Sequence, residues 1–232
     1  VMLGAGNVAW HLAPALQEAG HHIAQVYSRT YTSAEALGDH LVTDFTNRLE
    51  DIDRTASLYI IAVPDYAIDD MILNLQLGAD NIVVHTSGTV PLLGLEKISS
   101  RCGIFYPLQT FTKGDPVDMA QVPILVEGSD EETRETLHDI AKSIAKRVEF
   151  LDSEQRKQLH LAAVFANNFS NYLFTVADEI LANSELDFSL IQPLLQESVR
   201  KLKFKKPAEI QTGPAKRNDL KTIDEHIRLL EG

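Results

Sequence analysis

The side chains of this sequence that are best suited to proton transfer are those of two histidines. His85 begins the stretch HTSG directly after an apolar run, and His160 lies in a long segment without proline or glycine. An imidazole gains and loses a proton near neutral pH, so either histidine can serve as an acid or a base. Ser87 and Asn167 can orient a carbonyl or a carboxylate. We therefore predict that His85 or His160 moves a proton while Ser87 and Asn167 orient a substrate; for His85 the alternative is a structural, hydrogen-bonded role.

The segment around His160 has the pattern of a long helix with a polar stripe. Residues 153–184 contain neither proline nor glycine. Asparagine is a poor helix former, so Asn167, Asn168 and Asn171 carry a cost that an ordinary solvated face avoids. We predict that the stripe faces a polar pocket and that Asn171 contacts the substrate; an amphipathic helix with its polar face in water is the alternative. At about 100° per residue, the stripe contains His160, Val164, Asn167, Asn171 and Asp178.

Two further motifs supply polar groups for a substrate. FYPLQTF contains Tyr106 and Gln109, and QTGPAKRNDLKTIDEH contains Arg217 and Asp219. Lys216 and Arg217 lie near a predicted helix start, where the helix dipole disfavours cations unless a ligand or partner meets them. We predict substrate contacts from Tyr106, Gln109, Arg217 and Asp219. A packed aromatic ring and a surface capping segment are the alternatives, and no metal site is predicted.

The chain opens with a glycine pattern at the end of an apolar run. Gly4, Gly6 and Ala9 follow the form G-x-G-x-x-A of dinucleotide-binding loops. Gly4 permits a tight turn, Gly6 lets a pyrophosphate approach the backbone, and Ala9 lets the helix pack closely. Asn7 and Val8 open that helix, whose amide groups and dipole would face the phosphates. A plain strand-turn-helix is the alternative.

The end of the second predicted strand indicates which dinucleotide binds. An NAD site usually places Asp or Glu there to hold the ribose hydroxyls. This strand ends VYSRTYT, which contains no carboxylate. Ser28, Arg29 and Thr30 offer one cation and two hydroxyl donors, which suit a 2′-phosphate. We therefore predict NADP as the cofactor; the alternative is that Arg29 is a solvated surface side chain.

Two further strand ends lie on the same predicted rim. In open α/β sheets, ligands bind outside the carboxyl ends of the strands. Ala62, Val63 and Pro64 follow a buried apolar run, and we expect their backbone to border the ribose on the nicotinamide side. Thr86 follows the next run and is expected to contact the cofactor as well. Asp65 is equally suited to capping the helix that follows it.

The elements that position these residues follow from the alternation of apolar runs and helical patterns. Strands are expected at 1–3, 22–28, 57–64, 81–88, 103–111, 122–128 and 147–151, with helices between most of them. This pattern predicts an α/β Rossmann-like, doubly wound, mostly parallel sheet. After residue 152 only helices are expected. We predict an NADP-binding Rossmann domain at 1–152 and an all-α domain with one long helix at 153–232.

Composition excludes several classes of protein. The 232 residues contain 33 acidic and 21 basic side chains, a net charge of −12, which argues against nucleic-acid binding. No apolar run approaches the roughly 20 residues of a membrane span, and the single cysteine allows no internal disulfide. We expect a cytoplasmic protein without a signal peptide. Because Val1 lies in an apparent strand, we also expect a few residues to precede it.

Together, LGAGNVAWHL, HTSG, YPLQTF and QTGPAKRND resemble the NADP oxidoreductases that join a Rossmann-like domain to a helical domain of unknown function. That family is similar to the pyrroline-5-carboxylate reductase and 6-phosphogluconate dehydrogenase superfamily. The resemblance implies a homodimer built through the helical domains and leaves the substrate open. β-Hydroxyacid dehydrogenases of the superfamily carry a lysine one turn before an asparagine. Asn167 matches the asparagine, but Ala163 replaces the lysine, so that mechanism does not carry over.

These expectations combine into one leading hypothesis. The chain is expected to transfer a hydride between NADP(H) and a small polar substrate, such as a keto acid, a hydroxy acid or an imine. The missing lysine motivates an alternative, a non-catalytic NADP-binding sensor or regulatory protein. A helical scaffold with a purely structural Rossmann fold is a third possibility.

Overall fold

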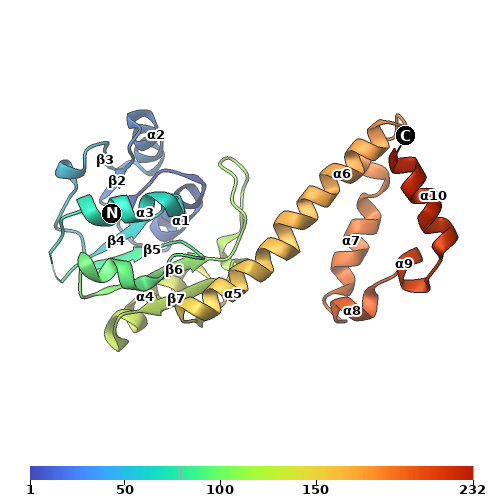
Figure 1. Ribbon diagram of the computed structural model, residues 1–232. Coiled ribbons are helices and arrows are strands. Elements are labelled where there is room, and N and C mark those ends of the chain that lie inside the picture. Colours follow the sequence, from blue (N-terminus) through green and yellow to red (C-terminus); the bar gives the residue numbers. More distant parts are fainter. Residues whose placement is uncertain (79, 232) are drawn as a thin grey trace. The chain divides into compact units, whose positions relative to one another are not determined.

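The computed structural model describes residues 1–78 and 80–231, and its contacts divide the chain into two compact units (Figure 1). The first unit is Val1–Val164 and the second is Phe165–Gly232. Each unit is described by itself. The predicted boundary at residue 152 differs from this division, because the helix that follows residue 152 bonds to the first unit through its side chains.

The first unit is built on one eight-stranded sheet. The strand order is β3-β2-β1-β4-β5-β6-β7-β8, and every neighbouring pair is parallel except β6 and β7. The chain runs outward from β1 through β2 to β3 and then crosses over to β4 on the other side of β1. This is the doubly wound strand order of Rossmann folds, so the predicted fold class is confirmed. The strands are β1 (Met2–Leu3), β2 (Gln25–Tyr27), β3 (Asp44–Thr46), β4 (Leu58–Ile61), β5 (Ile82–His85), β6 (Cys102–Pro107), β7 (Ile124–Gly128) and β8 (Val148–Phe150).

Helices cover both faces of this sheet. They are α1 (Asn7–Glu18), α2 (Tyr31–Leu41), α3 (Ile68–Asn74), α4 (Glu131–Ile144) and α5 (Ser153–Ala163), with 3₁₀ turns η1 (Leu49–Asp51), η2 (Asp65–Ala67), η3 (Leu92–Lys97) and η4 (Met119–Gln121). One core packs α1, α2 and α4 against the sheet, and a second packs α3 and η3.

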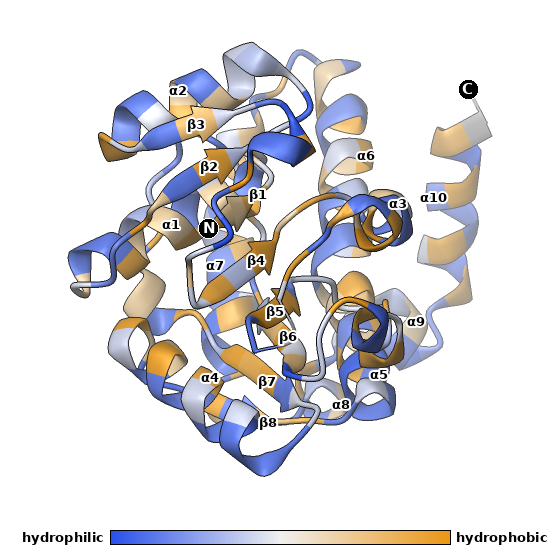
Figure 2. Cartoon of the chain, turned by 90° about the vertical axis from the view of Figure 1, so that its left-hand side faces the viewer, coloured by the Kyte–Doolittle hydropathy of each residue, from blue (hydrophilic) through white to orange (hydrophobic). Residues whose placement is uncertain are grey.

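The central strands are apolar on both sides because both cores use them. Val84 belongs to the core under α1, whereas its neighbour Val83 belongs to the core under α3. Figure 2 shows the resulting hydrophobic colour along β4, β5 and β7. This double burial is the reason that the sequence shows continuous apolar runs rather than alternation at these strands.

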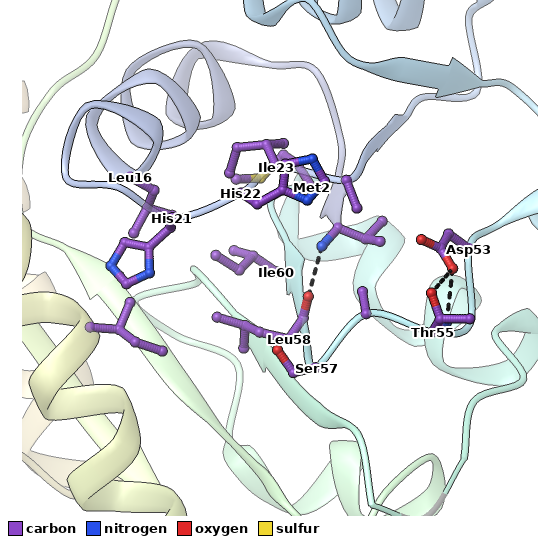
Figure 3. A pocket seen from close by; sticks show the side chains of 14 residues that line it. Met2, Leu16, His21, His22, Ile23, Asp53, Thr55, Ser57, Leu58 and Ile60 are labelled. Atoms are coloured by element: carbon purple, nitrogen blue, oxygen red, sulfur yellow. Dashed lines mark hydrogen bonds between the residues drawn. The ribbon is translucent and has the colours of Figure 1, made fainter.

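A cavity of about 470 Å³ lies at the amino-terminal edge of the sheet (Figure 3). The amino group of Val1 donates to the carbonyl oxygen of Leu58 over 2.7 Å, and Asp53 accepts from Thr55 beside it. The residues before β2 and β4 line the cavity. It therefore lies at the edge opposite the carboxyl ends of the strands, where the predicted site residues gather.

The second unit is helical, and its first helix continues from α5 through a π-helical turn. The turn η5 (Val164–Phe169) separates α5 from α6 (Ser170–Ala182). The long helix predicted for 153–184 is therefore present as an α–π–α run. The later elements are η6 (Phe188–Leu190), α7 (Gln192–Lys201), α8 (Pro207–Ile210), α9 (Pro214–Arg217) and α10 (Leu220–Glu231).

The π turn changes the predicted polar stripe. A π turn closes hydrogen bonds from i to i+5 and so contains more residues per turn than an α-helix. A projection at 100° per residue holds for α5 but not beyond Val164. Consequently the 100° projection from which the stripe is predicted does not apply to Asn167, Asn171 and Asp178.

Within the parts of the chain that are described, no helix combines the length and apolar character that crossing a bilayer requires. In the same parts, no cluster of three or more histidine, cysteine or carboxylate side chains is arranged to hold a metal ion.

Candidate functional site

The loop after β1 has a backbone that only glycine can adopt. Gly4 has a φ of +121°, and a Cβ there would lie 2.3 Å from the carbonyl oxygen of Ala62. The Gly4 amide donates to the carbonyl oxygen of Tyr27 over 2.8 Å, and this bond holds the turn against β2. The turn therefore passes close to both neighbouring strands, as a dinucleotide loop requires.

Beyond that turn, the start of α1 is open. Gly6 is the N-cap residue and has no side chain to occupy the amide groups of the first turn. A Cβ placed on Gly6 would meet no atom within 4 Å. The free amides of Asn7 and Val8 and the helix dipole can therefore receive a phosphate there. The Asn7 side chain accepts from the amide of Lys113 over 3.3 Å, which attaches the loop after β6 to this helix start.

A cavity of about 240 Å³ adjoins the glycine loop. Its volume suits part of a dinucleotide rather than the whole molecule. The sequence prediction included Gly4, Gly6, Ser28, Arg29, Thr30, Ala62, Val63 and Pro64, and all of these line the cavity. The predicted cofactor residues Asn7, Val8 and Thr86 are not among its lining residues. The prediction missed the other residues that line it, which are Ala5, Tyr27, Ser33, Leu49, Ala67, Asp70 and Met71.

Arg29 and three hydroxyl side chains meet in this cavity. Ser28, Thr30 and Ser33 lie on the segment that leads from β2 into α2. Arg29 is exposed, and within the described ranges it forms no ion pair. A guanidinium without a carboxylate partner, beside hydroxyl donors, is chemically suited to a phosphate. The residues present therefore fit a phosphate group of a pyridine dinucleotide.

His85 lies at the end of β5 and is fully buried, with 0% of its surface exposed. Its Nδ1 accepts from the amide of Ser87 over 3.2 Å. Burial, and to a smaller extent the positive charge of Arg156, lower the pKa of His85 to about 4. The imidazole is therefore neutral at physiological pH and bound to its own loop.

The loop after β5 is held by hydroxyl groups. Ser87 Oγ accepts from the amides of Thr89 and Val90, each over 3.0 Å. Thr89 in turn donates to the carboxylate of Asp65 over 2.5 Å, joining the segments that follow β4 and β5. Asp65 thus braces two loops and does not cap a helix, because Pro64 is the N-cap residue of η2 and no side chain caps it. Thr86 is buried, and its amide continues the strand pairing to Ile61.

Tyr106 and His160 form a hydrogen-bonded pair beside this loop. Tyr106 Oη and His160 Nδ1 are 2.9 Å apart, and their rings meet edge to face. A Cβ on Gly88 would lie 2.4 Å from His160 Nδ1 and 3.0 Å from the Tyr106 ring, so only glycine leaves room for the pair. Burial raises the pKa of the Tyr106 hydroxyl, and the carboxylate of Asp65 raises it further.

Arg156 fixes the helix that carries His160. It precedes His160 by one turn of α5, and only 1% of it is exposed. Its guanidinium donates to the Glu127 carboxylate on β7, to the carbonyl oxygen of Val90 over 2.5 Å, and to Ser153 over 3.3 Å. Sequence reasoning missed Arg156; its i, i+4 spacing to His160 was the available signal.

Most of the remaining residues that were predicted to contact the substrate are exposed. Gln109 is exposed, and its side-chain oxygen accepts from the amide of Thr110 over 2.8 Å. In the second unit, Asn167 lies in η5, and Asn171 in α6, and both are exposed, as is Arg217 in α9. The Asp219 carboxylate accepts from the amide and hydroxyl of Thr222, which lowers its pKa and caps α10.

Comparison with known families supports the two-part organisation. Residues 1–109 match the model of a Rossmann-like domain, and residues 122–231 match the model of the domain of unknown function DUF2520. The chain belongs to the family that joins these two domains, as the resemblance of its motifs predicts.

Solved structures agree with this membership. The putative NADP oxidoreductase BF3122 from Bacteroides fragilis is 39% identical, with a TM-score of 0.93, over 99% of this chain and 89% of its own. A 1-pyrroline-5-carboxylate reductase from Streptococcus pyogenes has a TM-score of 0.72 at 10% identity, over 99% and 93% of the two chains.

A reductive aminase from Aspergillus terreus, solved with NADPH and ethyl-5-oxohexanoate, has a TM-score of 0.69 at 15% identity. The match covers 87% of this chain and 72% of the aminase. At these low identities, the likeness to the reductase and to the aminase shows the fold alone. No curated protein matches the sequence of this chain.

Proposed function

We propose that the protein is an NADP-dependent oxidoreductase that transfers a hydride between NADP(H) and a small polar substrate, such as a keto acid, a hydroxy acid or an imine. The observation that carries the proposal is the cavity in which the glycine loop meets Arg29 and three hydroxyl side chains. The name of the Bacteroides fragilis relative supports the same class of cofactor.

Each part of the cofactor has residues of this chain to hold it. Gly4 permits the tight turn, Gly6 leaves room for the pyrophosphate, and the amides of Asn7 and Val8 donate to it. Ser28, Arg29 and Thr30 bind the 2′-phosphate, as the cavity lining suggests. The backbone of Ala62, Val63 and Pro64 borders the ribose on the nicotinamide side, and Thr86 follows on the next strand. When bound, the nicotinamide supplies or accepts the hydride.

The chain's own residues bind and orient the substrate and supply a proton. Ser87 Oγ accepts two backbone amides and lies 3.5 Å from the Thr89 hydroxyl, so its position in the loop is fixed. His85 is buried and neutral, whereas His160 is only partly buried, so His160 is the better placed of the two histidines for proton transfer. The substrate contacts that we propose are Tyr106, Gln109, Asn167, Asn171, Arg217 and Asp219.

The cofactor assignment is tested by comparing NADPH and NADH. We expect Arg29→Ala to weaken NADPH binding by about tenfold to a hundredfold, the loss of one charge-assisted contact, and to leave NADH binding unchanged. Titration of intrinsic fluorescence or calorimetry measures both. Arg147→Ala removes an exposed arginine that pairs with Glu149 on β8 and is the matched control. Equal affinity of the native protein for both cofactors, unaffected by Arg29→Ala, would contradict the assignment.

A non-catalytic NADP-binding sensor is the second candidate. Ala163, the last residue of α5, occupies the position where related β-hydroxyacid dehydrogenases carry their lysine. Both candidates bind NADPH, so binding does not separate them. Oxidation of bound NADPH by a keto acid, an aldehyde or a cyclic imine supports the enzyme; no consumption with any of them supports the sensor.

A homodimer formed through the helical unit is part of the same proposal. None of the described side chains from Phe165 to Leu230 is buried, although the unit is rich in large apolar residues. Exposed apolar surface of this extent marks an interface. A second copy offers the same surface, so an isologous contact is self-complementary. The exposed residues include Tyr172, Leu173, Phe174, Ile180, Leu194, Val199, Ile227, Leu229 and Leu230.

A further inference from the structure

We infer that Tyr106 is the proton donor of this site, that His160 is the positioning residue which keeps it ready, and that the substrate is a carbonyl compound rather than an iminium ion. This inference rests on the proposed oxidoreductase function. The inference adds the identity of the acid and the chemical class of the group that is reduced.

The first support is the position of the pair on the sheet. Tyr106 lies near the carboxyl end of β6, and its ring faces Gly88 in the loop after the neighbouring strand β5. That loop is bonded through Thr89 and Asp65 to the segment after β4, where Pro64 lines the cofactor cavity. A chain of direct contacts therefore connects the pair to the cofactor cavity along one edge of the sheet.

The second support is the way in which the surroundings hold the pair. Gly88 leaves the space that the imidazole occupies, and no larger residue could stand there without moving His160. Arg156 attaches the same helix to β7 and to the carbonyl oxygen of Val90. Two independent constraints thus set the position of His160 relative to Tyr106. Such restraint is expected of a catalytic constellation, whose geometry must hold to within about 0.5 Å.

The charges around Tyr106 keep its proton on the oxygen. Burial and the Asp65 carboxylate raise the pKa of Tyr106, and the guanidinium of Arg156, which is paired with Glu127, lowers it by less. His85 beneath the loop is neutral, because burial lowers its pKa to about 4. The phenol is therefore protonated across the physiological range and can donate.

The proton balance of carbonyl reduction matches this pair. The carbonyl carbon gains the hydride, the C=O π electrons move to oxygen, and that oxygen takes the proton of Tyr106 Oη. His160 then passes its Nδ1 proton to the phenolate oxygen while its Nε2 takes a proton from water. The net change is one hydride and one proton added to the substrate, and alcohol oxidation follows the reverse path.

An iminium ion would not need this donor. An iminium already carries the proton on nitrogen, so hydride addition produces a neutral amine directly. An alkoxide, by contrast, is about as basic as hydroxide, so the pKa of its conjugate acid lies far above that of a phenol. A phenol, even with a raised pKa, is the stronger acid, so it donates downhill to an alkoxide. Tyr106 thus serves a carbonyl substrate and is superfluous for an iminium.

The test compares carbonyl and iminium panels on the full chain with NADPH. We expect native protein to oxidise NADPH with 2-oxo acids, aldehydes or ketones and not with N-alkylated cyclic imines, which are iminium ions and need no proton at nitrogen. Tyr106→Phe should slow that turnover by about 10²–10⁴-fold, the usual contribution of a general acid. NADPH affinity should stay within twofold. Tyr59→Phe is the matched control, because it removes another inward tyrosine hydroxyl, bonded to the Asp53 carbonyl at the other edge of the sheet.

Two further variants separate a positioning role from a merely structural one. His160→Asn retains a side-chain amide near the Nδ1 position, which can still donate to Tyr106 Oη. We expect it to restore part of the rate lost in His160→Ala. Gly88→Ala should displace His160 and lower kcat more than it raises KM.

A measurement without cofactor or substrate tests the pair itself. Nitrogen-15 NMR of the histidine side chains should show the His160 Nδ1 signal shifting in Tyr106→Phe and unchanged in Tyr59→Phe. An unshifted signal in Tyr106→Phe would overturn the inference, and would leave the proposed oxidoreductase function in place.

The choice of substrate distinguishes failure of the Tyr106 inference from failure of the proposed oxidoreductase function. NADPH oxidation by N-alkylated cyclic imines that Tyr106→Phe does not slow would overturn the inference while supporting the oxidoreductase. NADPH binding without oxidation by any compound of either panel would overturn the oxidoreductase, and the inference would fall with it.

Discussion

The two units of this protein treat their apolar residues in opposite ways. In the first unit, two continuous cores cover both faces of the sheet, and side chains such as Leu137 are completely buried. In the second unit, Leu194 is 65% exposed, and none of the described side chains after Val164 reaches the buried class. The difference teaches that the sheet unit contains what it needs to be stable, whereas the helical unit needs a partner surface to bury its apolar residues.

The largest expected effect is a change of oligomeric state, caused by a substitution on helix α7 of the second unit. If a second copy covers Leu194, then Leu194→Asp places a charge in the interface and should convert a dimer into a monomer. Light scattering coupled to gel filtration measures the mass. Leu73→Asp on α3 is the control, because Leu73 is 75% exposed in the first unit and should leave the mass unchanged. A native protein that is monomeric at all concentrations would refute the dimer.

A smaller effect is expected from a buried leucine of the first unit. Leu137→Ala should lower the free energy of unfolding by about 2–5 kcal/mol, because it leaves a cavity between α4 and the sheet. Urea unfolding measures this cost, and it should not depend on protein concentration. Leu73→Ala should change it by less than about 0.5 kcal/mol. A cost for Leu137→Ala as small as that for Leu73→Ala would show that the comparison of the two units is wrong.

His85 is expected to make the free energy of unfolding depend on pH, by an amount comparable to the cost of Leu137→Ala. Its pKa falls from the ordinary 6.5 to about 4 in the folded protein, so the unfolded chain binds the proton more readily. The stability of the first unit should therefore fall as the pH drops from about 6.5 to about 4, by about 3 kcal/mol in total. Unfolding curves across this range measure the slope. His85→Asn should flatten the slope, and an unchanged slope would show that other groups cause it.

The amino-acid pattern predicted the parts of the fold that local chemistry controls. The apolar runs predicted the buried central strands, because residues such as Val83 and Val84 are covered on both faces. Gly4 predicted the loop, because its positive φ and its close approach to Ala62 require glycine, and Gly6 adds no side chain before α1. The edge strand β3 was missed, because its exposed residues do not form an apolar run.

Other features depend on residues that are distant in the chain and could not be predicted from it. The π turn after α5 changes the angular position of every following residue, and the 3.6-residue period used for the prediction cannot represent it. Arg156 reads as an ordinary helix-surface arginine until its contacts with β7 and with Val90 are known. Asp65 was considered as a helix cap, but its partner is Thr89, 24 residues away.

The sequence by itself determined the fold class, the glycine loop and the cationic strand end, because each depends on residue types at short spacing. Only the tertiary structure decided how the candidate acids differ. It buries His85 and holds it neutral, whereas it places His160 within hydrogen-bond distance of Tyr106, which lies 54 positions earlier. The physical reason is that burial and hydrogen bonding, which set the protonation of a side chain, come from neighbours that the fold assembles.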